Sequence, residues 1–304
     1  MRKEFERILE ETKKGNTTQL KINIGGTEYT RVFRPKERVI ILGGGHISQE
    51  LSVLAARLGF YVVVVDDREE YASVSRFPDA SSVICAEFED AIDGLRITAK
   101  DYVVIVTRAH QYDAQCIRAV LSECMPYYLG LLGSKRRTQG LIASLKDEGL
   151  NADWLDGINT PIGLDIGALT VEEIAVSITA QMIQYRRRDT KNKKNTNQFV
   201  EELFNEDVVA SIVSNDEPKA LLVVYDTIGS SPVKSGSFMT VSGPMKTMGT
   251  IGGGAAENLA INKAIDIIGT GKEEIVTVDM NPKTALDEGM ICGGTMKIYI
   301  KDLG

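Results

Sequence analysis

The chain has 304 residues, of which 43% are hydrophobic and 25% are charged, and its formal net charge is -7 at pH 7. This length allows two domains, and the composition is ordinary for a soluble globular protein. Binding to nucleic acid needs an excess of basic side chains to neutralise phosphates, so the acidic balance excludes general nucleic-acid binding. The 4 cysteines contain no CxxC pair and offer no disulfide scaffold, which indicates a reducing compartment.

Residues 1–35 are expected to form an extension, with an amphipathic helix near residues 1–14 and a hairpin around Gly25 and Gly26. The first residues mix charges without an apolar core, so they indicate neither a signal peptide nor a membrane anchor. No later run approaches the roughly 18 apolar residues of a membrane span. We therefore expect no membrane association and a cytoplasmic location.

Apolar strands alternate with helical patterns over residues 36–188, and a final helix runs from about Thr170 to Arg188. This alternation predicts a doubly wound parallel sheet, that is, an α/β domain of the Rossmann type. The expected strands are Val39–Leu42, Tyr61–Val65, Val83–Cys85, Tyr102–Thr107 and Tyr128–Leu132.

Residues 189–199 are polar and basic, and we interpret them as a solvated linker rather than a site for nucleic acid or acidic lipid. A smaller α+β domain is predicted over residues 200–304, with a helix from about Ala255 to Ile268. Its expected strands lie near Ala220–Tyr225, Ser237–Val241, Lys246–Gly249, Glu274–Val278 and Thr295–Ile300.

A glycine turn follows the first strand of the α/β domain. Gly43, Gly44 and Gly45 are followed by His46 and a helical pattern, which is the context of the G-x-G-x-x-G turn that binds pyrophosphate at a helix N-terminus. Ser48 replaces the third glycine, so slightly looser packing of helix on strand is expected. Asp66 ends the next strand, where a carboxylate can hold ribose hydroxyls, and Arg68 leaves the choice between NAD and NADP open.

The carboxyl ends of parallel strands lie on one edge of the sheet. The fourth strand is expected to bring Thr107 and His110 to this edge, and the fifth brings Gly133, Ser134 and Lys135. Cations in the first turn of a helix oppose its dipole, so Lys135 and the two arginines after it indicate either an anionic ligand or a solvated cluster. His110 is either a site residue or a turn residue bonded to backbone.

The small domain contains three loops rich in glycine and hydroxyl side chains, which suit an oxyanion or a phosphate better than a metal cation. Glycines on both sides of Cys292 favour a reactive thiolate. Cys85, Cys116 and Cys124 are expected to be buried packing residues. The loop residues that we assign to a binding site are Ser230, Ser231, Gly252, Gly253, Gly254, Glu257, Gly293 and Gly294.

Both domains resemble the XdhC/CoxI family. The first block resembles its Rossmann domain through Leu42–Ile47, Val65–Arg68, Arg76–Ala80, Thr107–Asp113, Leu129–Lys135 and Thr160–Gly167. The second resembles its small domain through Gly229–Pro232, Gly252–Glu257 and Gly289–Gly294. Two features depart from the family. The Rossmann block comes first here, although the small domain usually does, and Ala255 stands where many members have a cysteine, which excludes a two-cysteine mechanism at these positions.

The resemblance implies an accessory chaperone rather than a catalyst. Such a protein binds molybdenum cofactor, holds it while a cysteine desulfurase supplies sulfur, and inserts it into an apo molybdenum hydroxylase of the xanthine dehydrogenase type. Cys292 is then the expected molybdenum contact and, with His110, a candidate catalytic residue, while the glycine loops hold the pterin phosphate. A homodimer is also expected.

Two other classes of protein stay open from the sequence. The glycine turn and Asp66 would also serve an NAD(P)-dependent oxidoreductase, although His110 is the only evident acid-base candidate. A regulatory protein that senses a nucleotide through its Rossmann domain would bind nucleotide without molybdenum. Fold alone does not decide among these functions.

Overall fold

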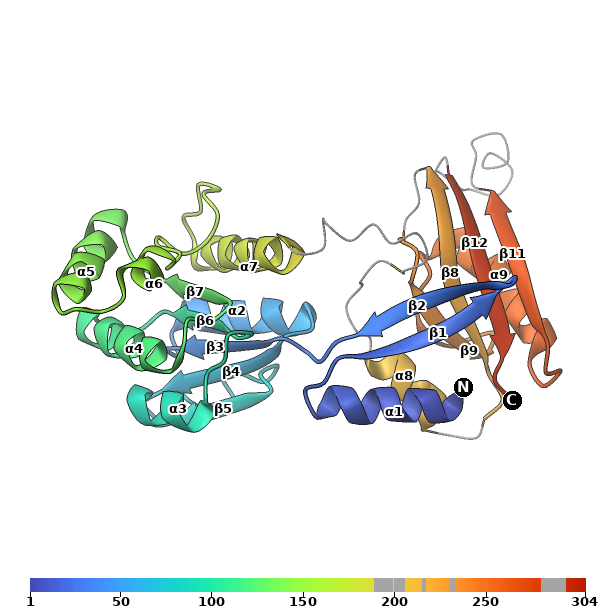
Figure 1. Cartoon of the computed structure of the whole chain (residues 1–304), viewed down its shortest axis with the longest axis horizontal. Coiled ribbons are helices and arrows are strands. Elements are labelled where there is room, and N and C mark those ends of the chain that lie inside the picture. Colours follow the sequence, from blue (N-terminus) through green and yellow to red (C-terminus); the bar gives the residue numbers. More distant parts are fainter. Residues whose placement is uncertain (189–198, 200–205, 215–216, 230–232, 280–293) are drawn as a thin grey trace. The chain divides into compact units, whose positions relative to one another are not determined.

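The structure is a computed structural model of the whole chain, and it describes residues 1–188, 199, 206–214, 217–229, 233–279 and 294–304. The chain divides into two compact units (Figure 1). One unit is the continuous segment 36–193, and the other combines residues 1–35 with residues 194–304. Among the described residues, no helix is long and apolar enough to cross a membrane.

The continuous unit contains a five-stranded parallel sheet in the order β5-β4-β3-β6-β7. This arrangement confirms the predicted doubly wound sheet. Each observed strand overlaps its predicted range and differs from it by no more than two residues at either end, because short apolar runs define the strand centres better than their ends. The strands are β3 (Arg38–Leu42), β4 (Tyr61–Asp66), β5 (Ser82–Cys85), β6 (Tyr102–Ile105) and β7 (Tyr128–Leu131).

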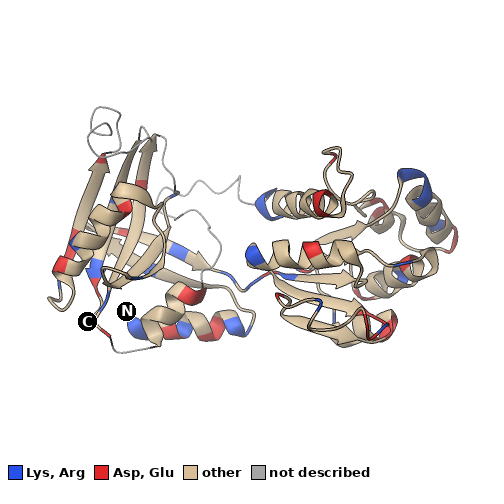
Figure 2. Ribbon diagram, turned by 180° about the vertical axis from the view of Figure 1, so that it is seen from behind, with Lys and Arg blue, Asp and Glu red and all other residues tan. Residues whose placement is uncertain are grey.

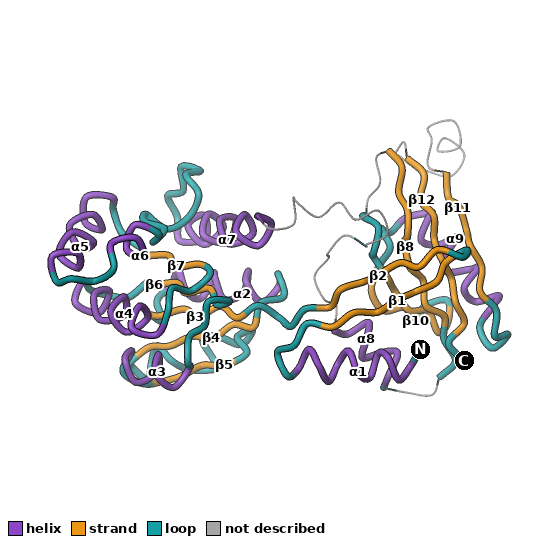
Figure 3. The backbone as a smooth tube through the Cα atoms, viewed as in Figure 1, coloured by secondary structure: helices purple, strands orange, loops and turns teal. Residues whose placement is uncertain are grey.

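Helices cover both faces of this sheet (Figure 3). Alternate side chains of each central strand enter opposite cores, since successive side chains point to opposite faces. One core packs α3, α4, α5 and α6 on the sheet, and the other packs α2 and α7. The helices are α2 (His46–Arg57), α3 (Phe88–Leu95), α4 (His110–Glu123), α5 (Lys135–Asp147), α6 (Ala152–Asp156) and α7 (Val171–Arg188).

The ends of α7 carry opposite charges (Figure 2). Its first turn contains Glu172 and Glu173, and its last turn contains three arginines. This distribution complements the helix dipole, which favours acidic groups at the N-terminus and basic groups at the C-terminus. Arg186 also pairs with Glu37 and stacks on the Phe60 ring at 3.8 Å, so the helix end is fixed to the sheet.

The second unit contains a five-stranded antiparallel sheet in the order β10-β9-β8-β12-β11. Helix α9 (Gly254–Ile267) covers one face. The other face packs against α1 (Arg2–Lys13), the hairpin of β1 (Thr18–Ile24) and β2 (Thr27–Phe33), and α8 (Glu206–Val213). The strands of the sheet are β8 (Ala220–Gly229), β9 (Phe238–Gly243), β10 (Lys246–Gly249), β11 (Glu273–Asp279) and β12 (Gly294–Asp302).

The N-terminal extension therefore forms part of the smaller unit. Phe5, Ile8 and Ile22 are 0–3% exposed and share one core with Leu221 and Tyr299 of the sheet. An amphipathic helix and a two-stranded hairpin are not stable alone in water, so this core accounts for their order.

One of the packing assignments for the cysteines is wrong. Cys116 is buried and Cys124 is half-buried, as expected, but Cys85 is exposed. The reason is that Cys85 ends the edge strand β5, where Val83 and Ile84 pack against the cores but are only half-buried, so the last residue of the strand is left exposed. Burial raises the pKa of the Cys116 thiol far above its ordinary value, so this cysteine is inert.

Candidate functional site

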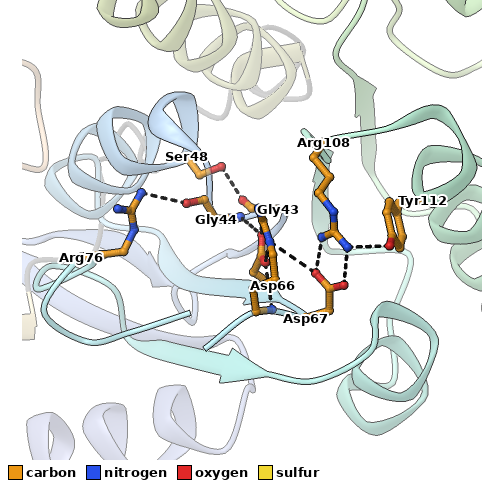
Figure 4. Close-up of polar contacts among 9 residues, drawn as sticks. Gly43, Gly44, Ser48, Asp66, Asp67, Arg76, Arg108 and Tyr112 are labelled. Carbon is orange, nitrogen blue, oxygen red and sulfur yellow. Dashed lines mark hydrogen bonds and ion pairs between the residues drawn. The ribbon is translucent and has the colours of Figure 1, made fainter. Parts of the chain in front are cut away.

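The candidate site of the Rossmann-type unit lies at the carboxyl edge of its sheet. The ends of β3, β4, β6 and β7 meet there, together with the N-termini of α2, α4 and α5. Figure 4 shows the glycine turn and the polar side chains beside it. The edge therefore combines backbone donors with arginines, which is suitable for an anionic ligand.

The three glycines of the turn have different requirements. Gly43 has φ +115, and a Cβ placed there would lie 2.5 Å from the Val106 carbonyl oxygen. A Cβ at Gly44 would collide with the Tyr71 carbonyl group. Gly45 has φ -71, and a Cβ there would meet no atom within 4 Å. Gly43 and Gly44 thus shape the turn, whereas Gly45 leaves open space at the start of α2, where a phosphate can approach the backbone.

Ser48, which stands in place of the third glycine, is fully buried and bonded. Its hydroxyl donates to the Gly43 carbonyl oxygen at 2.5 Å, so it fastens α2 to the turn (Figure 4). The looser packing expected from this replacement is not observed. His46, the first residue of α2, lies beside the open space at Gly45.

Asp66 is 1% exposed and accepts four hydrogen bonds. The Gly44 amide donates to Oδ2 at 2.7 Å, and Arg68 donates from its backbone amide, Nε and Nη2 at 2.9–3.1 Å. A carboxylate offers about four lone-pair positions, so the acceptor capacity of Asp66 is used within the protein. A ribose diol could bind to Asp66 only if it displaced one of these donors.

A second acid at the end of β4 binds an arginine that follows β6. Asp67 forms a two-pronged ion pair with Arg108, whose Nη2 also donates to the Tyr112 hydroxyl at 2.5 Å (Figure 4). The hydrogen bond from Arg108 lowers the pKa of Asp67 below its ordinary value, and the same pair raises the pKa of Arg108. The pair joins the ends of two strands and leaves Asp67 charged.

Thr107 and His110 belong to a second hydrogen-bonded group on this edge. Thr107 donates to Asp113 at 2.5 Å, and Arg137 donates from Nη2 to the same carboxylate at 2.7 Å and from Nε to His110 Nδ1 at 3.3 Å. Burial raises the pKa of Asp113, although the bonds from Thr107 and Arg137 oppose that shift. The geometry makes His110 Nδ1 an acceptor, which leaves Nε2 to carry the proton.

Residues 133–136 bring backbone and charge to the same edge. A Cβ at Gly133 would lie 2.8 Å from the Thr138 side chain, so a glycine allows the chain to enter α5 closely. Ser134, the N-cap residue of α5, is exposed, as are Lys135 and Arg136. The three cations of the first turn of α5 therefore have different surroundings. Arg137 pairs with Asp113, whereas Lys135 and Arg136 lie on the surface.

The smaller unit has its own glycine loop before α9. Gly252, Gly253 and Gly254 have φ of +116, +71 and +69, a backbone that side chains rarely allow. The Glu257 carboxylate accepts from the Thr250 hydroxyl at 2.6 Å and from the amides of Ile251 and Gly253 at 2.9 and 3.0 Å. Although partial burial raises the pKa of Glu257, these bonds outweigh it and hold the pKa below its ordinary value.

Glu257 therefore organises this loop through its Oε2 atom. Open space surrounds the Cβ positions of Gly253 and Gly254. Cys292, Gly293, Ser230 and Ser231 lie outside the described residues, and Gly294 begins β12. Among the described residues, no group of three or more His, Cys, Asp or Glu side chains is placed to hold a metal ion.

Sequence reasoning missed several residues that organise the edge. Asp67, Asp113 and Arg76 were parts of motifs without an assigned role, and the ion pair of Arg137 was not foreseen. Arg76 donates to the Gly44 carbonyl oxygen at 3.2 Å from a loop that follows β4. The guanidinium carbon of Arg68 lies over the Tyr71 ring, 3.6 Å from its centroid. The runs of adjacent acidic and basic residues indicated ion pairs, but the sequence around each residue did not indicate which distant residue it would pair with.

The fold and its two glycine loops define a two-domain protein built on a Rossmann-type sheet. A family model described as the XdhC Rossmann domain matches residues 39–182, and a model described as the XdhC and CoxI family matches residues 212–279. The two matches together cover well over half of the chain, which belongs to the XdhC and CoxI family.

Similar proteins carry related names. The chain is 37% identical over 156 residues to a Bacillus subtilis protein that is named as a probable xanthine dehydrogenase subunit, a match that covers 51% of this chain and 45% of that protein. It is 30% identical over 159 residues to the uncharacterized protein YqeB of Escherichia coli, with coverage of 52% and 29%. The chain therefore spans less than half the length of these curated relatives.

A crystal structure of a Bacillus halodurans protein, described as a xanthine dehydrogenase, is also similar. It aligns with 34% sequence identity and a TM-score of 0.48, over 54% of this chain and 49% of that chain.

Proposed function

We propose that this chain is a maturation factor for a molybdenum hydroxylase of the xanthine dehydrogenase type. In this role it binds molybdenum cofactor as cargo, holds it during sulfuration and inserts it into the apo-enzyme. The observation that carries the proposal is the presence of both family modules in one chain. The name of the Bacillus subtilis relative, which refers to xanthine dehydrogenase, supports the same partner.

The chemistry of the described residues fits the phosphate of such a cargo. Open space at Gly45, Gly253 and Gly254 allows a ligand to approach backbone at helix N-termini, where amides and the helix dipole favour an anion. Arg68 and Arg76 add positive charge beside the first of these positions. The same groups offer nothing that favours a hydride-transfer reaction over binding.

Cys292 enters the proposal on sequence grounds. A thiolate is a soft ligand, and its glycine neighbours allow close approach, so we assign it the contact with molybdenum. His110, held by Arg137, is a positioning group at the edge of the Rossmann-type unit in this proposal. The expected protein partners are the apo hydroxylase and a cysteine desulfurase, and we expect the factor itself to act as a homodimer.

The test measures molybdenum and pterin that stay with the full chain after incubation with freshly released cofactor and desalting. We compare wild type with Cys292→Ala and with Cys85→Ala, a control that removes an exposed cysteine at another place. Retention by wild type and Cys85→Ala, with loss in Cys292→Ala, is expected. Equal retention by all three proteins would refute the role of Cys292, and retention by none would favour a nucleotide-dependent enzyme or sensor.

A further inference from the structure

The Asp66 carboxylate at the end of β4 is not free to bind a ribose. An acidic residue at this position of a Rossmann-type sheet holds ribose hydroxyls when its oxygens are free to accept. The Asp66 side chain is 2% exposed and already accepts from the Gly44 amide and from three donors of Arg68. Displacing Gly44 would break the turn itself, because that bond joins the turn to β4.

Arg68, in contrast, is accessible and still has donors. Its side chain is 31% exposed, and it lies against Tyr71 with 3.6 Å between the guanidinium carbon and the ring centroid. Nε and Nη2 bond to Asp66, and among the described residues no acceptor is bonded to Nη1. Asp66 and Tyr71 thus hold a guanidinium in a fixed orientation with donors left for a ligand, a geometry that suits phosphate oxygens.

An arginine beside the turn is bonded to no carboxylate among the described residues. Asp66 pairs with Arg68, and Asp67 pairs with Arg108, so these four charges compensate one another. Arg76 bonds to the Gly44 carbonyl oxygen and to Gln49, and no carboxylate pairs with it in the part of the chain that the structure describes. Its buried Nε has no hydrogen-bond partner there. Arg76 therefore contributes one uncompensated positive charge, 5.0 Å from the ring that also holds Arg68.

We propose that Arg68 and Arg76 form a subsite for a phosphomonoester at the end of β4, and that this subsite selects ligands that carry such a phosphate over ligands that end in a free ribose diol. The inference rests on the proposed function, because it specifies which group of the bound molecule this edge recognises. The phosphate can belong to the pterin of molybdenum cofactor or to the 2′ position of a nucleotide. Both sources present the same dianionic group to the two arginines.

The test compares NADP⁺ with NAD⁺, which differ only in the 2′-phosphate, by equilibrium dialysis with the full chain. Wild type is expected to bind NADP⁺ about 10- to 100-fold more tightly than NAD⁺, which is the ratio of dissociation constants that one or two charged hydrogen bonds provide. Arg68→Gln and Arg76→Gln should each reduce this preference. Arg118→Gln is the matched control, because it removes an exposed arginine that pairs with Glu148 away from the turn. Thermal unfolding of each variant checks that the fold is kept.

Molybdenum retention distinguishes the two sources of phosphate. Loss of retention in Arg68→Gln, or displacement of bound cofactor by NADP⁺, assigns the subsite to the pterin phosphate. A preference for NADP⁺ that leaves retention unchanged assigns it to a nucleotide. The inference is overturned if Arg68→Gln retains molybdenum fully and wild type either binds NAD⁺ and NADP⁺ equally well or binds neither. In that case a wild-type chain that still retains cofactor leaves the maturation role intact.

Discussion

The glycine turn allows a paired substitution that separates folding from binding. Gly43→Ala would place a Cβ 2.5 Å from the Val106 carbonyl oxygen at φ +115. Backbone strain costs about 1–3 kcal/mol, and steric overlap costs about 1–3 kcal/mol. Together they lower the free energy of unfolding by about 4 kcal/mol. For a unit of this size, that corresponds to a fall of roughly 8–16 °C in melting temperature. Gly45→Ala meets no atom within 4 Å, so its stability should stay within about 1 kcal/mol of wild type.

Calorimetry of both variants and cofactor retention are the two assays. Gly43→Ala should lower the melting temperature of the Rossmann-type unit. Gly45→Ala should melt like wild type and yet retain about tenfold less cofactor, because its methyl group occupies the space through which a phosphate approaches the backbone. The reasoning fails if Gly43→Ala is as stable as wild type, or if Gly45→Ala loses as much stability as Gly43→Ala.

Other substitutions test the smaller unit. The pKa of Glu257 lies below its ordinary value of 4.5, so its stabilising effect is present above that pH and is lost as the pH falls through the folded-state value. Glu257→Gln should therefore lower the melting temperature at pH 7 and flatten the loss of stability towards acid; a melting curve with an unchanged pH dependence would contradict this. Phe5→Ala should cost the smaller unit about 3–5 kcal/mol in urea unfolding, whereas the exposed Lys3→Ala should change little. Equal stability of these two variants would show that α1 adds nothing to the core.

The strands and most helices of both units could be predicted from local patterns. The periodicity that predicted a helix from about Thr170 to Arg188 corresponds to α7, and β10 has the bounds that the sequence indicated. Helix α8, of 8 residues, was not predicted, because it is too short to show a clear period. The packing of the first 35 residues on the second sheet was also missed, since contacts between distant segments leave no local signal.

The candidate site was predictable in position but not in detail. The glycine turn and the strand ends were expected at one edge, and they lie there. The acidic residues were harder to interpret, because their tasks depend on partners. Asp66 was expected to face a ribose, but it bonds to Gly44 and Arg68, and Glu257 bonds to its own loop. An acid at a motif position is thus available to a ligand only if the protein leaves its oxygens without donors.

The insertion of segment 36–193 between the two parts of the smaller unit has a consequence for synthesis on the ribosome. The Rossmann-type unit is continuous, so it can fold as soon as it has emerged, and domains generally do so in order. Helix α1 and the β1–β2 hairpin emerge earlier, but their sheet is complete only when β12, which lies between β8 and β11, has been made. Phe5, Ile8 and Ile22 therefore lack their packing partners until nearly the whole chain has been made, and apolar surface that stays exposed during synthesis favours aggregation.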